Sequence, residues 1–96
     1  MTDTLELGAV VCTSRIKNQL FKAYGDRAYE AIDFLLACHD SGCWGDLDAE
    51  DIKTNEWGIE NGGTIMSVYK LNDGPTVWII TEWDRSVTTV LAPEDY

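Results

Sequence analysis

The hydrophobic pattern of this chain changes its period at Gly63, and that change constrains the fold more than any other feature. Before Gly63, apolar residues recur every three or four positions, which is the spacing of one face of a helix. After it, the stretches TIMSVYKL, TVWIITE and SVTTVL are rich in β-branched and aromatic residues and follow a period of two. The sequence therefore predicts helices first and strands in the last part of the chain.

A short apolar run, residues 7–12, precedes the helices and predicts a first strand. Three helices should follow it, each with a capping residue at its start and glycine close to its end. Their expected limits are Thr13 or Ser14 to Gly25, Asp26 to the stop at Asp40-Ser41-Gly42, and Asp48 to the stop at Gly62-Gly63.

Short links join the three predicted strands after Gly63, which favours an antiparallel meander without helix. With the first strand, the element order becomes β-α-α-α-β-β-β, an α+β fold whose helices pack on one face of a small antiparallel sheet. Either Val77 and Ile79, or Trp78 and Ile80, should face the helices. Residues 1–96 are predicted to form a single domain, because a chain of this length supports one core.

The charge balance excludes two classes of partner. With 17 acidic residues against 7 basic ones, the formal net charge is -10. The clustered Lys and Arg that would neutralise nucleic-acid phosphates, or hold an anionic membrane, are missing. The start of the chain, MTDTLELGAVVC, carries acids and no basic residue ahead of its apolar run, unlike a signal peptide. We therefore expect a cytoplasmic protein that binds neither nucleic acid directly nor a membrane.

The segment CHDSGC places Cys38, His39 and Cys43 at one helix end and in the loop after it. These side chains could bind zinc, but a fourth ligand is missing nearby, and Cys12 would complete the set only if the first strand ended beside this loop. Cys38 and His39 point about 100° apart on a helix, which is poor geometry for a catalytic pair. We expect no metal, no cofactor and no enzymatic activity, with His39 placed in the field of the helix dipole.

Seven acids and a single base, Lys53, lie between Asp40 and Glu60. Acids in the first turn of the third predicted helix favour the helix dipole, but Glu56 and Glu60 form a like-charge pair at the end where the dipole disfavours them. Helix stability therefore does not account for the whole run. Two interpretations stay open: an exposed face that is only solvated, and a negative surface complementary to a basic partner.

Four tryptophans are many for a chain of this length. Trp78 lies in the middle of a predicted strand and is expected in the core. Trp44 and Trp83 lie in loops, where aromatic side chains either close a small core or anchor an interface. If the acids and these loop tryptophans form one binding surface, its residues are Trp44, Asp46, Asp48, Glu50, Asp51, Glu56, Glu60, Trp83 and Asp84.

The link 83–85 is predicted to be a tight turn pinned by an ion pair between Arg85 and Glu82 or Asp84. Around it, the stretches GCWGDLDAEDIKTNE, GGTIMSVYKL and WIITEWDRSVTTVLAPEDY, in that spacing, resemble a family of short plasmid-related proteins from bacterial plasmids and other mobile elements. The resemblance extends over residues 8–96. In this chain Cys43 and Trp83 stand where the family pattern leads us to expect an acid and a small residue.

The resemblance implies that the protein is carried by a mobile genetic element, but it does not imply a particular reaction or ligand. A small acidic protein of a mobile element is expected to be a non-enzymatic binding module that meets the basic surface of a nucleic-acid-handling protein complex. It would act as a nucleic-acid mimic that inhibits a host restriction or CRISPR complex. One alternative is a small enzyme or metal-site protein that uses His39, Asp46, Glu82 and Arg85. Another is a homodimer that adds strands at an open sheet edge.

Overall fold

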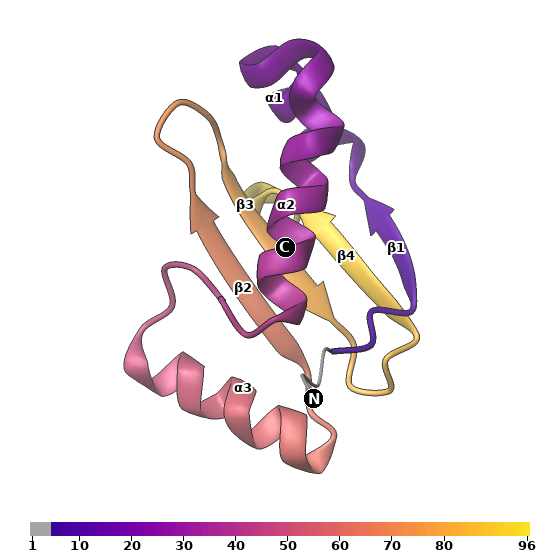
Figure 1. Ribbon diagram of the computed structural model, residues 1–96, viewed down its shortest axis with the longest axis vertical. Coiled ribbons are helices and arrows are strands. Elements are labelled where there is room, and N and C mark those ends of the chain that lie inside the picture. The colour runs from indigo at the N-terminus through magenta and orange to yellow at the C-terminus, as the bar shows by residue number, and fades with distance from the viewer. Residues whose placement is uncertain (1–4) are drawn as a thin grey trace.

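The computed structural model describes residues 5–96 and shows an α+β fold in which helices pack with a four-stranded mixed sheet (Figure 1). The first four residues, part of the segment on which the signal-peptide prediction depends, lie outside this range. Within it, no helix has the length and apolar character needed to cross a membrane. In chain order the elements are β1 (Ala9–Cys12), α1 (Ser14–Tyr24), the 3-10 helix η1 (Gly25–Arg27), α2 (Ala28–Asp40), α3 (Ala49–Asn61), β2 (Ile65–Lys70), β3 (Thr76–Thr81), β4 (Val87–Leu91) and the 3-10 helix η2 (Pro93–Asp95).

The sheet has the strand order β1-β4-β3-β2. The strands β2, β3 and β4 form the predicted antiparallel meander, and no helix lies within residues 76–91. In contrast, β1 pairs with β4 in parallel, with Ala9 opposite Val87. The prediction of a purely antiparallel sheet is therefore wrong, and η1 and η2 were not predicted. A meander fixes only its own strand directions, while the helices between β1 and β2 allow β1 to join either edge in either direction.

Capping residues set most of the helix limits as predicted. At the start of α1, Thr13 Oγ1 accepts a hydrogen bond from the Ile16 N–H at 3.3 Å. Asp48 caps α3 in the same way, and Gly62 ends α3 in the left-handed conformation. The prediction differs at α2, where Asp26 lies in η1 instead of capping the α-helix.

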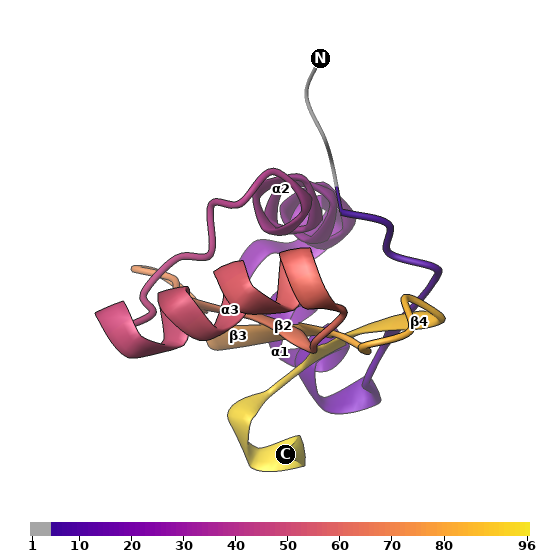
Figure 2. The same cartoon turned by 90° about the horizontal axis from the view of Figure 1, so that it is seen from below.

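The core lies between α1, α2 and one face of the sheet. On β3, Val77 and Ile79 point into it and are fully buried, so the first of the two predicted alternatives is confirmed. Trp78 points to the opposite face, is half-buried, and packs edge-on against Tyr96 with ring centroids 5.2 Å apart. The prediction of a core position for Trp78 is wrong, because the period of two sends neighbouring side chains to opposite faces. Figure 2 shows the C-terminal end of the chain on the side of the sheet opposite α2.

The outer edge of β2 is closed by side chains and a loop instead of by another strand. Asn55 on α3 donates from Nδ2 to the Met66 carbonyl at 2.7 Å and accepts from the Met66 N–H at 3.1 Å. The loop before α3 bonds to both backbone polar groups of Val68, and Asp46 Oδ2 accepts from the Lys70 N–H at 2.9 Å. Such closure protects an edge strand against unwanted pairing. It also fixes α3 and the preceding loop against the sheet.

Replacing Asn55 with leucine should lower the free energy of unfolding by about 2–3 kcal/mol, because two hydrogen bonds are lost and the backbone groups of Met66 are left unpaired beneath the helix. The matched control is Thr54→Ala, because the Thr54 hydroxyl donates to the Glu50 carbonyl of the same helix and to no other group of residues 5–96. That change should cost less than about 1 kcal/mol. Urea denaturation followed by circular dichroism measures both, and equal losses would contradict the role given to Asn55.

Candidate functional site

The helix α3 contacts the sheet through small and polar residues, which leaves its large apolar side chains outside. Asn55 and Gly58 are its buried residues. A β-carbon on Gly58 would lie 2.9 Å from Ile65 Cδ1, so the helix lies close against the strand. As a result, the side chains of Trp57 and Ile59 remain 61% and 51% exposed.

Exposed carboxylates also lie on α3 and on the loop before it. They belong to Asp46, Asp48, Glu50, Asp51, Glu56 and Glu60. Over residues 5–96, the ion pairs are Arg15 with Asp95 and Arg27 with Glu30, so no neighbouring base neutralises these carboxylates. Two of the acids serve the fold, because Asp48 caps α3 and Asp46 accepts a hydrogen bond from β2. The others add negative charge to the exposed part of α3, where Trp57 and Ile59, two residues apart, point to different sides of the helix.

The link 83–85 is a turn, as predicted, but Arg85 binds backbone carbonyls instead of a carboxylate. Asp84 Oδ1 accepts from the Ser86 hydroxyl at 2.7 Å and from the Ser86 N–H at 3.1 Å, and these bonds lower the pKa of the Asp84 carboxyl. The Arg85 guanidinium donates to the Gly58 carbonyl at 3.0 Å. A cation at the C-terminal end of a helix is favoured by the helix dipole. Arg85 therefore fastens the turn to α3, and the predicted ion pair is replaced.

Trp83 belongs to this turn and is 64% exposed, so it lies at the surface near the C-terminal end of α3. Trp44, by contrast, is half-buried and lines a pocket. We use the name α3 surface for the exposed acidic and apolar residues of α3 together with the turn tryptophan. Its members are Glu50, Asp51, Ile52, Glu56, Trp57, Ile59, Glu60 and Trp83.

A buried hydrogen-bond network links α2 to the sheet through His39, which is fully buried. Thr88 Oγ1 donates to the Leu7 carbonyl at 2.7 Å, so Thr81 Oγ1, 2.7 Å from Thr88 Oγ1, must be the donor between the two hydroxyls. Thr81 Oγ1 then accepts from His39 Nε2–H at 2.9 Å, and His39 Nδ1 accepts from the Ser67 hydroxyl at 2.5 Å. This chain of donors fixes one tautomer of a neutral imidazole.

Burial lowers the pKa of His39 to about 4. The side chain is therefore neutral at physiological pH, and the expected interaction of a charged His39 with the helix dipole is wrong. Both ring nitrogens are occupied by hydroxyl groups. Burial and then the neighbouring Cys43 thiol raise the pKa of the Cys38 thiol. Over residues 5–96, no three His, Cys, Asp or Glu side chains lie close enough together to hold a metal ion.

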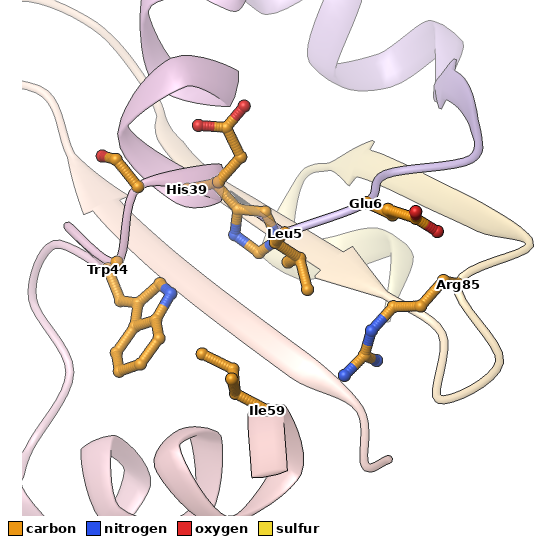
Figure 3. A pocket seen from close by; sticks show the side chains of 9 residues that line it. Leu5, Glu6, His39, Trp44, Ile59 and Arg85 are labelled. Atoms are coloured by element: carbon orange, nitrogen blue, oxygen red, sulfur yellow. The ribbon is translucent and has the colours of Figure 1, made fainter. Parts of the chain in front are cut away.

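A pocket of about 340 Å³ lies beside this network, between the end of α2, α3 and the turn between β3 and β4 (Figure 3). Its lining includes His39 and Arg85 but neither Asp46 nor Glu82. The four residues considered for an enzyme or metal site are therefore not brought together in one cavity. Because His39 is bound to hydroxyls and Arg85 to carbonyls, both side chains hold the fold around the pocket.

Comparison of this chain with models of protein families, with curated proteins and with solved structures found no match. The resemblance to plasmid-related proteins therefore stays a prediction. The α3 surface and the pocket are the features of the structure that indicate a function.

Sequence reasoning did not identify the partners of His39. A signal for them was present, because Ser67, Thr81 and Thr88 occupy inward-pointing positions of three adjacent strands, where apolar residues are the rule. Hydroxyls at such positions need hydrogen-bond partners. A histidine in the last turn of the covering helix is the residue that can supply them.

Proposed function

We propose that this protein is a non-enzymatic binding module whose α3 surface docks on a basic surface of a nucleic-acid-handling protein complex. The observation that carries the proposal is the combination of exposed Trp57, Ile59 and Trp83 with carboxylates that have no ionic partner in the described part of the chain. In protein interfaces, aromatic anchors supply affinity, while surrounding charges supply association rate and specificity. A net charge of -10 suits a partner whose ordinary ligand is nucleic acid.

The specific function that we propose is inhibition of a host restriction or CRISPR complex in the cytoplasm. Such complexes hold nucleic-acid phosphates with clustered Lys and Arg, and a fixed array of carboxylates can occupy the same site. The contacts of Asn55 and Arg85 hold α3 at both its middle and its C-terminal end, so the carboxylates stand on a rigid element. Inhibition by occupancy requires no catalytic group, cofactor or metal from this chain.

Reversing the charge of Glu56 and Glu60 should separate stability from binding. Both lie in the second half of α3, whose last turn has no basic residue, so their carboxylates oppose the helix dipole. Glu56→Lys/Glu60→Lys should therefore not lower the free energy of unfolding, because the favourable interaction of two cations with the helix dipole offsets the like-charge contacts of about 0.2–0.5 kcal/mol each among Lys53 and the two new lysines. Urea denaturation checks this expectation. A clear loss of stability would mean that the two acids serve the fold and not a partner.

Affinity capture from a bacterial lysate tests the proposed function. Immobilised wild-type protein should retain nucleic-acid-binding proteins at low salt, release them at high salt, and lose them when duplex DNA or RNA competes. Glu56→Lys/Glu60→Lys should retain far less. The matched control, Glu30→Lys/Asp33→Lys, makes the same change of net charge at exposed positions of α2 and should retain as much as wild type. Equal capture by both variants, or retention unaffected by nucleic acid, would contradict the proposal.

The strand β1 gives specific support to a second candidate, a homodimer. It lies at the edge of the sheet, all its residues are exposed, and Val10 and Val11 are 44% and 47% exposed. An uncharged exposed edge of this kind can pair with the same strand of a second copy. Sedimentation velocity over a range of protein concentrations measures this directly. A monomer throughout would remove the homodimer from consideration.

A further inference from the structure

The walls of the pocket beside His39 are held in place by hydrogen bonds, so the cavity is built into the fold. Leu5 N–H donates to the Asp40 carbonyl at 3.1 Å, which holds the chain before β1 across the end of α2. The Trp44 carbonyl accepts from the Val68 N–H at 3.1 Å, which holds the opposite wall against β2. Preformed cavities of this kind are the usual binding sites of small molecules, and 340 Å³ lies near the lower end of their range of roughly 300–1,000 Å³.

The lining combines apolar surface with one unsatisfied donor. Leu5, Trp44 and Ile59 supply the apolar walls, and Arg85 lies at one end. Trp44 Nε1 is shielded from solvent and has no hydrogen-bond partner among residues 5–96. Figure 3 shows this nitrogen on the edge of the indole that faces Leu5 and His39. A buried donor without a partner is rare in folded proteins and costs about 1–3 kcal/mol, so an acceptor placed there is favoured.

The charges around the cavity restrict the ligand further. Glu6 and Asp40 contribute to the lining, and the chain as a whole carries a net charge of -10, so an anion is disfavoured. The Arg85 guanidinium, which also lines the pocket and is held by backbone carbonyls, disfavours a cation. An uncharged molecule is repelled neither by the acidic side chains nor by Arg85.

We propose that this pocket binds a small, uncharged, mainly apolar molecule that carries a carbonyl oxygen and accepts a hydrogen bond from Trp44 Nε1. Its apolar part packs against Leu5 and Ile59. Because Trp44 Nε1 is shielded from solvent, this hydrogen bond requires the indole to turn its N–H towards the oxygen of the ligand. This site is separate from the docking of a protein on the α3 surface, although Ile59 borders both.

Nuclear magnetic resonance with three matched probes tests the ligand class. Acetophenone carries the carbonyl, ethylbenzene lacks it, and benzoate adds a negative charge. The four tryptophans should give four indole N–H signals in a nitrogen–proton spectrum, and the signal that disappears in Trp44→Phe belongs to Trp44. Acetophenone should move that signal downfield in a saturable manner and leave the Trp57 and Trp83 signals in place. Ethylbenzene should bind without the downfield shift, and benzoate should bind several-fold more weakly than acetophenone.

Two variants of α3 test the location. Ile59→Asp places a carboxylate in the pocket wall, whereas Ile52→Asp makes the same change at an exposed position of α3 that does not line the pocket. The first should weaken acetophenone binding at least tenfold, and the second should leave it unchanged. Glu56→Lys/Glu60→Lys should also leave it unchanged, so failure here is distinguishable from failure of the proposed function. An unmoved Trp44 signal, the same shift with ethylbenzene, or equal affinities of Ile59→Asp and Ile52→Asp would overturn the proposal.

Discussion

Gly45→Ala is expected to destabilise the protein by roughly 4 kcal/mol, a large share of the 5–15 kcal/mol typical of a small domain. Gly45 has a φ of 77°, and an added β-carbon would lie 2.1 Å from the Val68 carbonyl oxygen and 2.7 Å from Tyr69 Cδ1. The loop would have to move away from β2 to relieve these contacts. It would then lose the hydrogen bonds that Trp44 and Asp46 make to Val68.

Gly42→Ala is the matched control for this prediction. Gly42 also has a positive φ, of 89°, but an added β-carbon would have no atom of residues 5–96 within 4 Å. Only the backbone strain of about 1–2 kcal/mol should therefore be measured. Urea denaturation of the two variants separates strain from steric contact, and equal losses would show that the approach of Gly45 to β2 is not required for stability.

The free energy of unfolding should fall by about 3 kcal/mol as the pH is lowered from 7 to 4, because of His39 alone. Burial lowers its pKa from 6.5 in the unfolded chain to about 4 in the folded protein. Between these values the unfolded state binds a proton that the folded state does not. This contribution to stability is therefore fully present above about pH 6.5 and is lost as the pH falls towards 4.

The variant His39→Gln isolates the effect of this one group. Glutamine stays neutral and can both donate and accept hydrogen bonds, so the variant should be less stable at pH 7 but should lose the His39 part of the pH dependence. Asp84 and Asp95 have lowered pKa values, and their contribution is lost only at still lower pH, in both proteins. Chemical denaturation at several pH values measures the difference, and parallel curves for the two proteins would show that His39 is not held neutral by burial.

Local signals predicted the parts of this fold that depend on neighbouring residues. Thr13 and Asp48 bond to backbone groups three residues further on, and Gly62 takes the conformation that ends a helix, so each acts within its own helix. The strands β2 to β4 follow from a period of two and short links. These features are encoded within a few residues of where they occur.

The predictions that were wrong concern contacts between residues that lie far apart in the sequence. The parallel pairing of β1 joins Ala9 to Val87, across almost the whole chain. The inward face of α3 consists of Asn55 and Gly58. The Asn55 side chain makes the hydrogen bonds to the β2 backbone that a neighbouring strand would otherwise make, and Gly58 lets the helix lie close to Ile65. An apolar pattern does not mark such a face. Among the site residues, the exposure of the acids was predictable from their charge, whereas the pocket position of Trp44 depends on how the loop meets β2.

The most direct test of the account measures the association rate of this protein with a captured partner as a function of salt. Between about 50 mM and about 500 mM salt, the wild-type rate should fall at least tenfold, because screening removes the attraction between the α3 surface and a basic partner. Glu56→Lys/Glu60→Lys should associate slowly at every salt concentration, and Trp83→Ala should mainly dissociate faster. A salt-independent wild-type rate that charge reversal leaves unchanged, with activity lost only in His39→Ala, would contradict the binding account and favour a catalytic one.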